Sequence, residues 1–222
     1  MREMSQTFVA AYRLVAAALA LTGIALLFVV EHGGPGEFVY FTTQGNVLAG
    51  GCFLWGAVAH GAPRRGWAGP STVVRGGITL YIMVIFLVFH LVLANPASGF
   101  ADDGAVQFGS IQNLLLHTVT PALALLDWIL ITGERPRWRW AAAWLAYPLA
   151  YLVFVLVRGT LVHRYPYPFL DVRSLGYRGV AIVAFGLLVL FWLLGLLTVA
   201  VRRPTGRVRS PSHAAASAPD AP

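Results

Sequence analysis

Residues 179–201 read GVAIVAFGLLVLFWLLGLLTVAV, a run of 23 residues without a charged side chain. An α-helix needs about 20 mainly apolar residues to cross the hydrocarbon core of a bilayer. This run is therefore predicted to be a transmembrane helix, and the rest of the sequence must fit a protein that resides in a membrane.

Five further apolar stretches of similar length fill most of the chain. Their expected bounds are 9–30, 39–60, 73–94, 110–132 and 138–158. The composition agrees, because 58% of the 222 residues are hydrophobic and only 11% are charged, which a soluble domain does not need. The sequence thus predicts an all-α, polytopic integral membrane protein with one domain, residues 1–202, built as a bundle of six transmembrane helices.

Residues 203–222 differ in composition from this domain. They are rich in Pro, Ser, Ala and Arg. Such a segment has too little apolar surface to fold, so we expect a disordered cytoplasmic tail. Cys52 is the single cysteine, which excludes an internal disulfide.

The basic residues are all arginine, and their distribution predicts the topology. Short cytoplasmic loops of membrane proteins carry an excess of basic side chains. Twelve arginines fall at the N-terminus, at the second and fourth connections and after the sixth helix, and four fall around the fifth connection. Both termini are therefore predicted to be cytoplasmic. We interpret the net charge of +7 as topology and expect membrane lipids, not a nucleic acid, as partners.

The use of Arg without Lys, with many Ala, Gly and Val residues, is typical of a GC-rich bacterial genome. The expected location is accordingly the bacterial plasma membrane, which the chain crosses several times. The sequence does not set the oligomeric state.

Polar side chains cluster in the outer halves of the second and fourth helices. Thr42 and Asn46 lie one turn apart, as do Asn113 and His117, so each pair shares a helix face. At about 1.5 Å per residue, the two helices bring their pairs to similar depth. Pro121 has no amide hydrogen and is predicted to free the carbonyl of His117, four residues earlier.

Each of these residues also has a structural interpretation. Threonines often hydrogen-bond to their own helix, and a membrane histidine often joins two helices. An ionisable side chain at this depth is nevertheless a functional candidate by default. Gln44 and His90, at comparable depth, are supporting candidates.

Asp127 lies at a different level of the bundle. It is ten residues beyond His117, or about 15 Å along the helix, and is too far to orient that imidazole. The main interpretation is a structural ion pair or hydrogen bond near His60, and a proton relay is the alternative. The expected cationic neighbours are Arg64, Arg65 and Arg139.

The fifth connection, Arg158–Asp171, is basic and aromatic. Two X-Pro pairs favour extended backbone at Tyr165 and Tyr167. The segment is either a lid over an outer-facing cavity or an aromatic interface belt in which Arg158 and Arg164 extend to the membrane surface.

Several short motifs resemble a known family. They are Tyr40-Phe-Thr-x-Gln-x-Asn46, His117 with Pro121, Asp127-Trp128, Tyr147-Pro148, Arg158-Gly159 and Tyr165-Pro-Tyr-Pro-Phe-Leu-Asp171. These segments resemble the androgen-inducible membrane hydrolases, six-helix proteins with bacterial relatives of unknown activity. The resemblance implies hydrolysis of esters of hydroxy fatty acids, with Thr42 as nucleophile and His117 as base. Thr43 leaves the nucleophile open by one position.

The chemistry that the resemblance implies needs further groups. An ester carbonyl becomes an oxyanion when it is attacked, and the amides of Asn46, Asn113 or Gln44 are the expected donors. Asp171 would orient His117 only if the fifth connection folds back over the site. The expected substrate is a lipid or fatty-acyl ester from the outer leaflet.

The same resemblance leaves roles for the basic side chains of the fifth connection. Arg158 or Arg164 would pair with a substrate carboxylate, or would simply extend to the membrane surface. No metal and no cofactor is expected.

Three other functions stay open. His90 and His117 lie on consecutive helices and would offer two axial ligands to a haem. A small transporter would use His117, Asp127 and His60 as stations for a proton. A structural membrane protein would need none of these side chains for chemistry.

Overall fold

The computed structural model describes residues 5–30, 32–62, 66–101, 110–131 and 134–202. Within these ranges every regular element is helical, which confirms the all-α prediction. Five helical segments are long and apolar enough to cross a membrane, namely Gln6–Val29, Thr72–Leu93, Ile111–Leu130, Arg139–Val162 and Val172–Val201. The predicted tail, 203–222, lies outside the described residues.

The elements follow one another along the chain without a strand in the described ranges. The α-helices are α1 Gln6–Val29, α2 Phe41–Gly61, α3 Thr72–Val88, α4 Ile111–Leu114, α5 Thr120–Leu130, α6 Arg139–Ala143, α7 Ala146–Val162 and α8 Val172–Val201. The π-helical segments are η3 Phe89–Leu93 and η5 Leu115–Val119. The 3₁₀ segments are η1 Pro35–Val39, η4 Pro96–Ser98 and η6 Pro168–Leu170.

The second predicted span corresponds to α2, which has 21 residues. It is less apolar than the other five because Thr42, Thr43, Gln44 and Asn46 occupy its first turns. Small residues let it approach α1 closely: a Cβ added at Gly50 would lie 2.8 Å from a methyl group of Leu21. Close packing through glycine is typical of helix pairs in membranes.

Side-chain caps fix the start of several helices. Ser5, Ser71 and Ser110 accept hydrogen bonds from amides in the first turns of α1, α3 and α4. Asp171 accepts from the amide of Arg173 at the start of α8 (2.9 Å). These side chains satisfy amides that have no partner within the helix.

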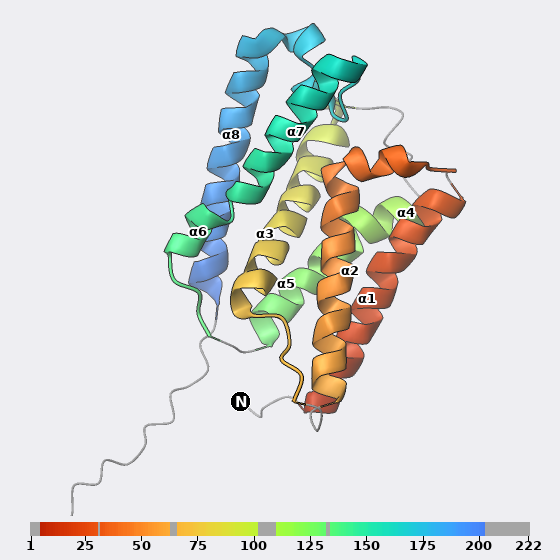
Figure 1. The fold of residues 1–222 in the computed structure, drawn as a ribbon, viewed down its shortest axis with the longest axis vertical. Coiled ribbons are helices and arrows are strands. Elements are labelled where there is room, and N and C mark those ends of the chain that lie inside the picture. The colour runs from red at the N-terminus through yellow and green to blue at the C-terminus, as the bar shows by residue number, and fades with distance from the viewer. Residues whose placement is uncertain (1–4, 31, 63–65, 102–109, 132–133, 203–222) are drawn as a thin grey trace, which may run out of the picture.

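The helices form a bundle in which α3 is central and packs against α2, α5 and α8 (Figure 1). The start of α1 and the end of α8 lie in the lower part of Figure 1, whereas η1 and the connection that contains η6, between α7 and α8, lie in the upper part. We call the end with η1 and η6 the outer end and the end with Ser5 and Arg202 the inner end, following the arginine distribution.

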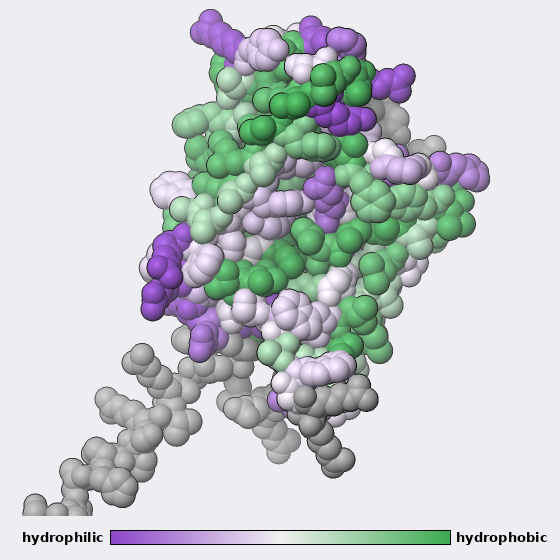
Figure 2. Space-filling view, in the orientation of Figure 1, coloured by the Kyte–Doolittle hydropathy of each residue, from purple (hydrophilic) through white to green (hydrophobic). Residues whose placement is uncertain are grey.

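The surface of the bundle matches a lipid environment. In Figure 2, hydrophobic side chains cover much of the middle of the visible face, and strongly hydrophilic ones gather mainly at the top and beside α6. Phe185 and Ile182 of α8 are 69% and 64% exposed. A large apolar side chain that faces outward is stable in a hydrocarbon solvent.

The fifth predicted span, 138–158, is broken between α6 and α7. Pro148 has no amide hydrogen for the carbonyl of Trp144, four residues earlier. The hydroxyl of Tyr81 on α3 donates to this carbonyl instead (2.9 Å). The carbonyl that this proline leaves free therefore connects α3 to the junction of α6 and α7.

The last helix is longer than predicted. It begins at Val172 rather than at 179, and Gly176 interrupts it with a φ of 66°. This left-handed conformation is accessible to glycine at little cost. The short turn before Gly176 therefore changes direction and stays beside η6.

Candidate functional site

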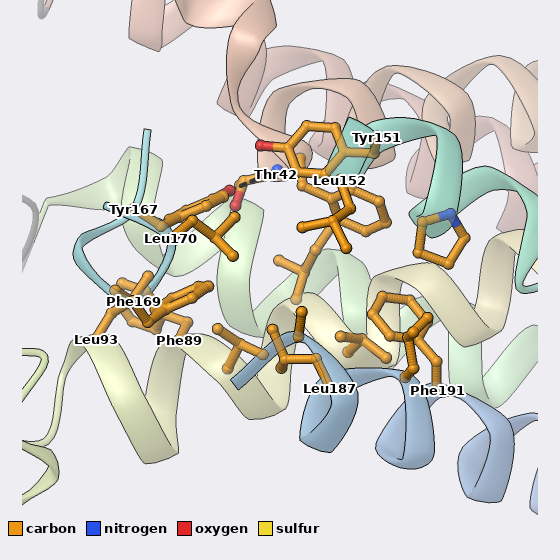
Figure 3. Close-up of a pocket in the computed structure, with 17 residues that line it drawn as sticks. Thr42, Phe89, Leu93, Tyr151, Leu152, Tyr167, Phe169, Leu170, Leu187 and Phe191 are labelled. Carbon is orange, nitrogen blue, oxygen red and sulfur yellow. Dashed lines mark hydrogen bonds between the residues drawn. The ribbon is translucent and has the colours of Figure 1, made fainter. Parts of the chain in front are cut away.

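A cavity of about 80 Å³ lies near the outer end between α3, α7 and α8. Figure 3 shows its walls, which come mainly from aromatic and aliphatic side chains. The start of α2 and the segment 163–171 close one end, where Thr42, Tyr151 and Tyr167 contribute hydroxyl groups. Among the described residues, those that line the cavity carry no charge.

Tyr167 positions the polar end of this cavity. The backbone amide of Thr42, in the first turn of α2, donates a hydrogen bond to the Tyr167 hydroxyl (3.4 Å). The Tyr167 ring stacks on Phe169 with 5.1 Å between ring centres. Because burial raises the pKa of Tyr167 above its usual range, its hydroxyl keeps its proton and can itself donate.

Thr42 lines the cavity, whereas Thr43 does not. Thr43 is only 2% exposed and packs inside the bundle. The neighbouring Gln44 donates to the Phe38 carbonyl (2.7 Å) and accepts from the Tyr147 hydroxyl (2.6 Å). Its amide is thus engaged at the helix start.

The side chain of Asn46 contacts a backbone carbonyl of another helix, a partner that the sequence does not predict. Its side-chain amide donates to the carbonyl of Thr42 (2.9 Å) and to the carbonyl of Leu116 on the fourth span (3.2 Å). Its own carbonyl oxygen, Oδ1, has no hydrogen-bond partner among the described residues. Asn46 therefore joins two helices below Thr42.

The π-helical segment η5 changes which carbonyl Pro121 leaves free. The amide of Thr120 bonds to Leu115, five residues earlier. In this register the missing amide of Pro121 would have served Leu116, not His117. The sequence pointed to the carbonyl of His117 because regular α-helical bonding was assumed, whereas the structure shows a side-chain donor, Asn46, on the carbonyl of Leu116.

His117 lies behind the cavity wall. Its ring stacks on Phe89, with 3.8 Å between ring centres and an angle of 13°. Phe89 lines the cavity and His117 does not. In the described residues no hydrogen bond joins the Thr42 hydroxyl to His117, whose Nδ1 lies 3.2 Å from the Asn113 carbonyl oxygen.

His90 occupies the other π-helical segment, η3. Its Nδ1 lies 2.9 Å from the Phe86 carbonyl oxygen and its Nε2 lies 3.3 Å from the Thr118 hydroxyl. Phe89 touches this imidazole as well, with 5.1 Å between ring centres. The two histidines thus share Phe89 as a neighbour, and π-helical segments often occur at functional sites.

The segment 163–171 covers the outer end of the bundle. Phe169 and Leu170 are buried in the core, and the ring of Tyr165 lies where a Cβ at Gly159 would otherwise be. Tyr167, Phe169 and Leu170 of this segment are thus buried against the cavity and do not lie along the lipid surface.

The charged residues of the fifth connection, Arg158–Asp171, do not line the cavity. Arg158 donates to the Arg164 carbonyl (3.3 Å), and neither side chain lines the cavity. Asp171 pairs with Arg173 (3.0 Å), whose hydrogen bonds hold the pKa of Asp171 below its usual range. Asp171 caps α8 and does not contact His117.

Asp127 forms a buried ion cluster near the inner end. One carboxylate oxygen accepts from Arg13 Nε (2.7 Å) and the other from Arg75 Nη2 (2.5 Å). His60 Nδ1 lies 3.3 Å from Arg13 Nη1. The structural ion pair near His60 is therefore present, but its cations are Arg13 and Arg75.

Other arginines were expected as neighbours of Asp127 from the sequence. Of these, Arg139 is exposed on α6, and Arg64 and Arg65 lie outside the described residues. Arg13 and Arg75 were expected to be loop charges because each lies close to the expected end of a span. The contact of Phe89 with His117, which lies on another span, was not predicted.

Comparisons with protein-family models, with curated proteins and with solved structures gave no match to this chain. The fold and its surface define a polytopic helical membrane protein, and the resemblance to membrane hydrolases stays a prediction.

Proposed function

We propose that this membrane protein binds the acyl chain of a neutral lipid in the cavity between α3, α7 and α8. The uncharged lining carries this proposal, because a buried carboxylate or ammonium would find no counter-charge there. A neutral ester or alcohol would instead use the hydroxyls of Thr42 and Tyr167 at one end, since the Tyr151 hydroxyl donates to the Val39 carbonyl (2.9 Å).

The surroundings of the cavity support entry from the bilayer. Its walls include Leu152 of α7 and Leu187 of α8. The outward faces of the same helices are apolar, as Phe154 and Phe185 show with exposed fractions of 46% and 69%. A lipid chain that enters between these helices would leave one apolar environment for another, so entry costs little hydrophobic free energy.

Binding can be tested by filling the cavity. Leu187→Trp adds volume inside it, and Leu193→Trp adds the same side chain to an exposed position of the same helix. Native mass spectrometry with a neutral long-chain ester should show a complex for the wild type and for Leu193→Trp, and little for Leu187→Trp. Equal binding by all three proteins would overturn the proposal.

We further propose ester hydrolysis as the chemistry, because Thr42 lies in the cavity wall. Its Oγ1 would attack the ester carbonyl carbon, and its proton would pass through His117 to the departing alcohol as the ester C–O bond breaks. Water would then cleave the acyl-threonine, releasing the fatty acid and restoring the hydroxyl. For His117 to act, the Phe89 side chain must turn out of the stack.

Activity tests separate this chemistry from binding alone. Thr42→Ala and His117→Ala should each reduce hydrolysis of a chromogenic long-chain ester to near background, whereas Thr43→Ala should keep most of it. The double substitution of Thr42 and His117 should be scarcely worse than either single one. If the wild type binds the ester without cleaving it, or if Thr42→Ala stays fully active, hydrolysis is refuted and lipid binding stands.

A further inference from the structure

The inner end of the bundle holds more buried positive charge than negative charge. Arg13, Arg75 and Arg202 are 2%, 9% and 1% exposed, and Asp127, at 5%, is the one buried carboxylate of the described residues. A charge without a counter-ion is costly inside a membrane bundle. The cluster therefore needs either a compensating dipole or an anion.

Arg202 has a dipole close to it. Its Nη1 donates to the carbonyls of Trp128 and Ile131 (2.7 Å for Ile131), near the C-terminus of α5. Its guanidinium also lies over the Trp128 ring, 4.4 Å from the centre. Helix C-termini carry partial negative charge, so this arginine is partly compensated.

Arg13 and Arg75 share the single charge of Asp127. In both arginines, Nε and Nη2 donate hydrogen bonds to the carboxylate of Asp127. The group of three thus keeps one net positive charge. Nη1 of Arg75 makes no hydrogen bond to another described residue.

A second cavity lies against this group. It measures about 20 Å³, and Arg13, Arg75, Asp127, Cys52 and Thr79 are among the residues that line it. This volume is enough for one water molecule or one ion of similar size, and too small for a phosphate group. Polar walls beside a positive charge favour an anion over an empty space.

We propose that this cavity is a binding site for a small monovalent inorganic anion such as chloride. The anion would lie beside the free Nη1 of Arg75. It would neutralise the one positive charge that Asp127 does not compensate. It would join α1, α2, α3 and α5 at the inner end, opposite the lipid cavity, and so stabilise the fold without taking part in the outer site.

Chloride binding can be measured directly on the purified protein. The ³⁵Cl resonance of chloride should broaden in the presence of the wild type, and the melting temperature should rise when gluconate is replaced by chloride at constant ionic strength. If the ³⁵Cl resonance does not broaden and chloride does not raise the melting temperature, the cavity holds only water and the proposal is wrong.

Two variants on α2 distinguish this cavity from surface arginines. Cys52→Leu fills the cavity and should abolish both responses, whereas Gly51→Ala, where an added Cβ meets nothing within 4 Å, should keep both. A full chloride response in Cys52→Leu would place the anion elsewhere.

A variant with more positive charge beside the cavity should respond more strongly to chloride. Asp127→Asn removes the only buried carboxylate of the described cluster, so chloride should stabilise this variant more than it stabilises the wild type. A merely structural defect lowers the melting temperature equally in both salts. An unchanged chloride increment in a folded Asp127→Asn protein would contradict the proposal.

Discussion

Asn46 of α2 supplies the hydrogen bond that Pro121 cannot give to the carbonyl of Leu116, at 3.2 Å. The same arrangement recurs where Tyr81 donates to the Trp144 carbonyl that Pro148 leaves free. In a membrane bundle water cannot satisfy these carbonyls, so a side chain from a neighbouring helix must. Each proline therefore fixes a contact between two spans.

Asn46 and Pro121 should be energetically coupled. Asn46→Ala should lower the free energy of unfolding by about 1–3 kcal/mol, because it leaves a buried carbonyl without a donor. Pro121→Ala restores an amide to the helix, so Asn46→Ala should cost less in that background. Denaturant titrations of the four proteins test this, and additive effects would show that the two sites are independent.

Asp127 is expected to serve stability. Asp127→Asn leaves two buried guanidinium groups facing a neutral amide and should lower the free energy of unfolding by roughly 3–5 kcal/mol. Glu134→Gln, at an exposed carboxylate at the same end, should have little effect. Ester hydrolysis should survive in folded Asp127→Asn protein, and its complete loss there would support a proton relay instead.

Gly56 makes room for Arg13. A Cβ at this position would lie 2.9 Å from both Cδ and Nη1 of the Arg13 side chain. Gly56→Ala should therefore displace Arg13 from Asp127 and lower stability by about 1–3 kcal/mol. Gly51→Ala on the same helix is the matched control and should be neutral or stabilising, since alanine favours a helix. Equal melting temperatures for both variants would contradict this role.

Gly159 holds the lid through Tyr165. A Cβ at Gly159 would overlap the Tyr165 ring, so Gly159→Ala should displace the segment 163–171 and lower the melting temperature. Tyr165→Ala in the same chain should recover part of the loss. Gly186→Ala, where the added Cβ meets nothing within 4 Å, is the control. Failure of Tyr165→Ala to improve the Gly159→Ala protein would show that the clash is not the cause.

The topology prediction can be checked with single cysteines in a Cys52→Ala background. Gly34 and Arg164 are exposed at the outer end, and Arg137 is exposed near the inner end. An impermeant thiol reagent should label cysteines at the first two positions in intact cells and leave Arg137→Cys unlabelled until the membrane is broken. The reverse pattern would invert the topology.

The sequence by itself determined the helical membrane class. Runs such as 179–201 have no charged side chain, and the need to satisfy every backbone group in lipid leaves the helix as the local solution. It also predicted an ion pair for Asp127, since a carboxylate at that depth requires a partner. Both conclusions follow from the cost of polar groups in hydrocarbon, which depends on residue type and position along the span.

Only the tertiary structure decided which residues meet. Arg13 and Arg75 look like loop charges in the sequence, yet the bundle brings both onto Asp127. Phe89 of η3 stacks on His117 of η5, and Thr42 of α2 instead meets Tyr167. A shift of one hydrogen-bond register turns a helix face, and single-sequence periodicity contains no signal for that shift, because packing between helices sets it.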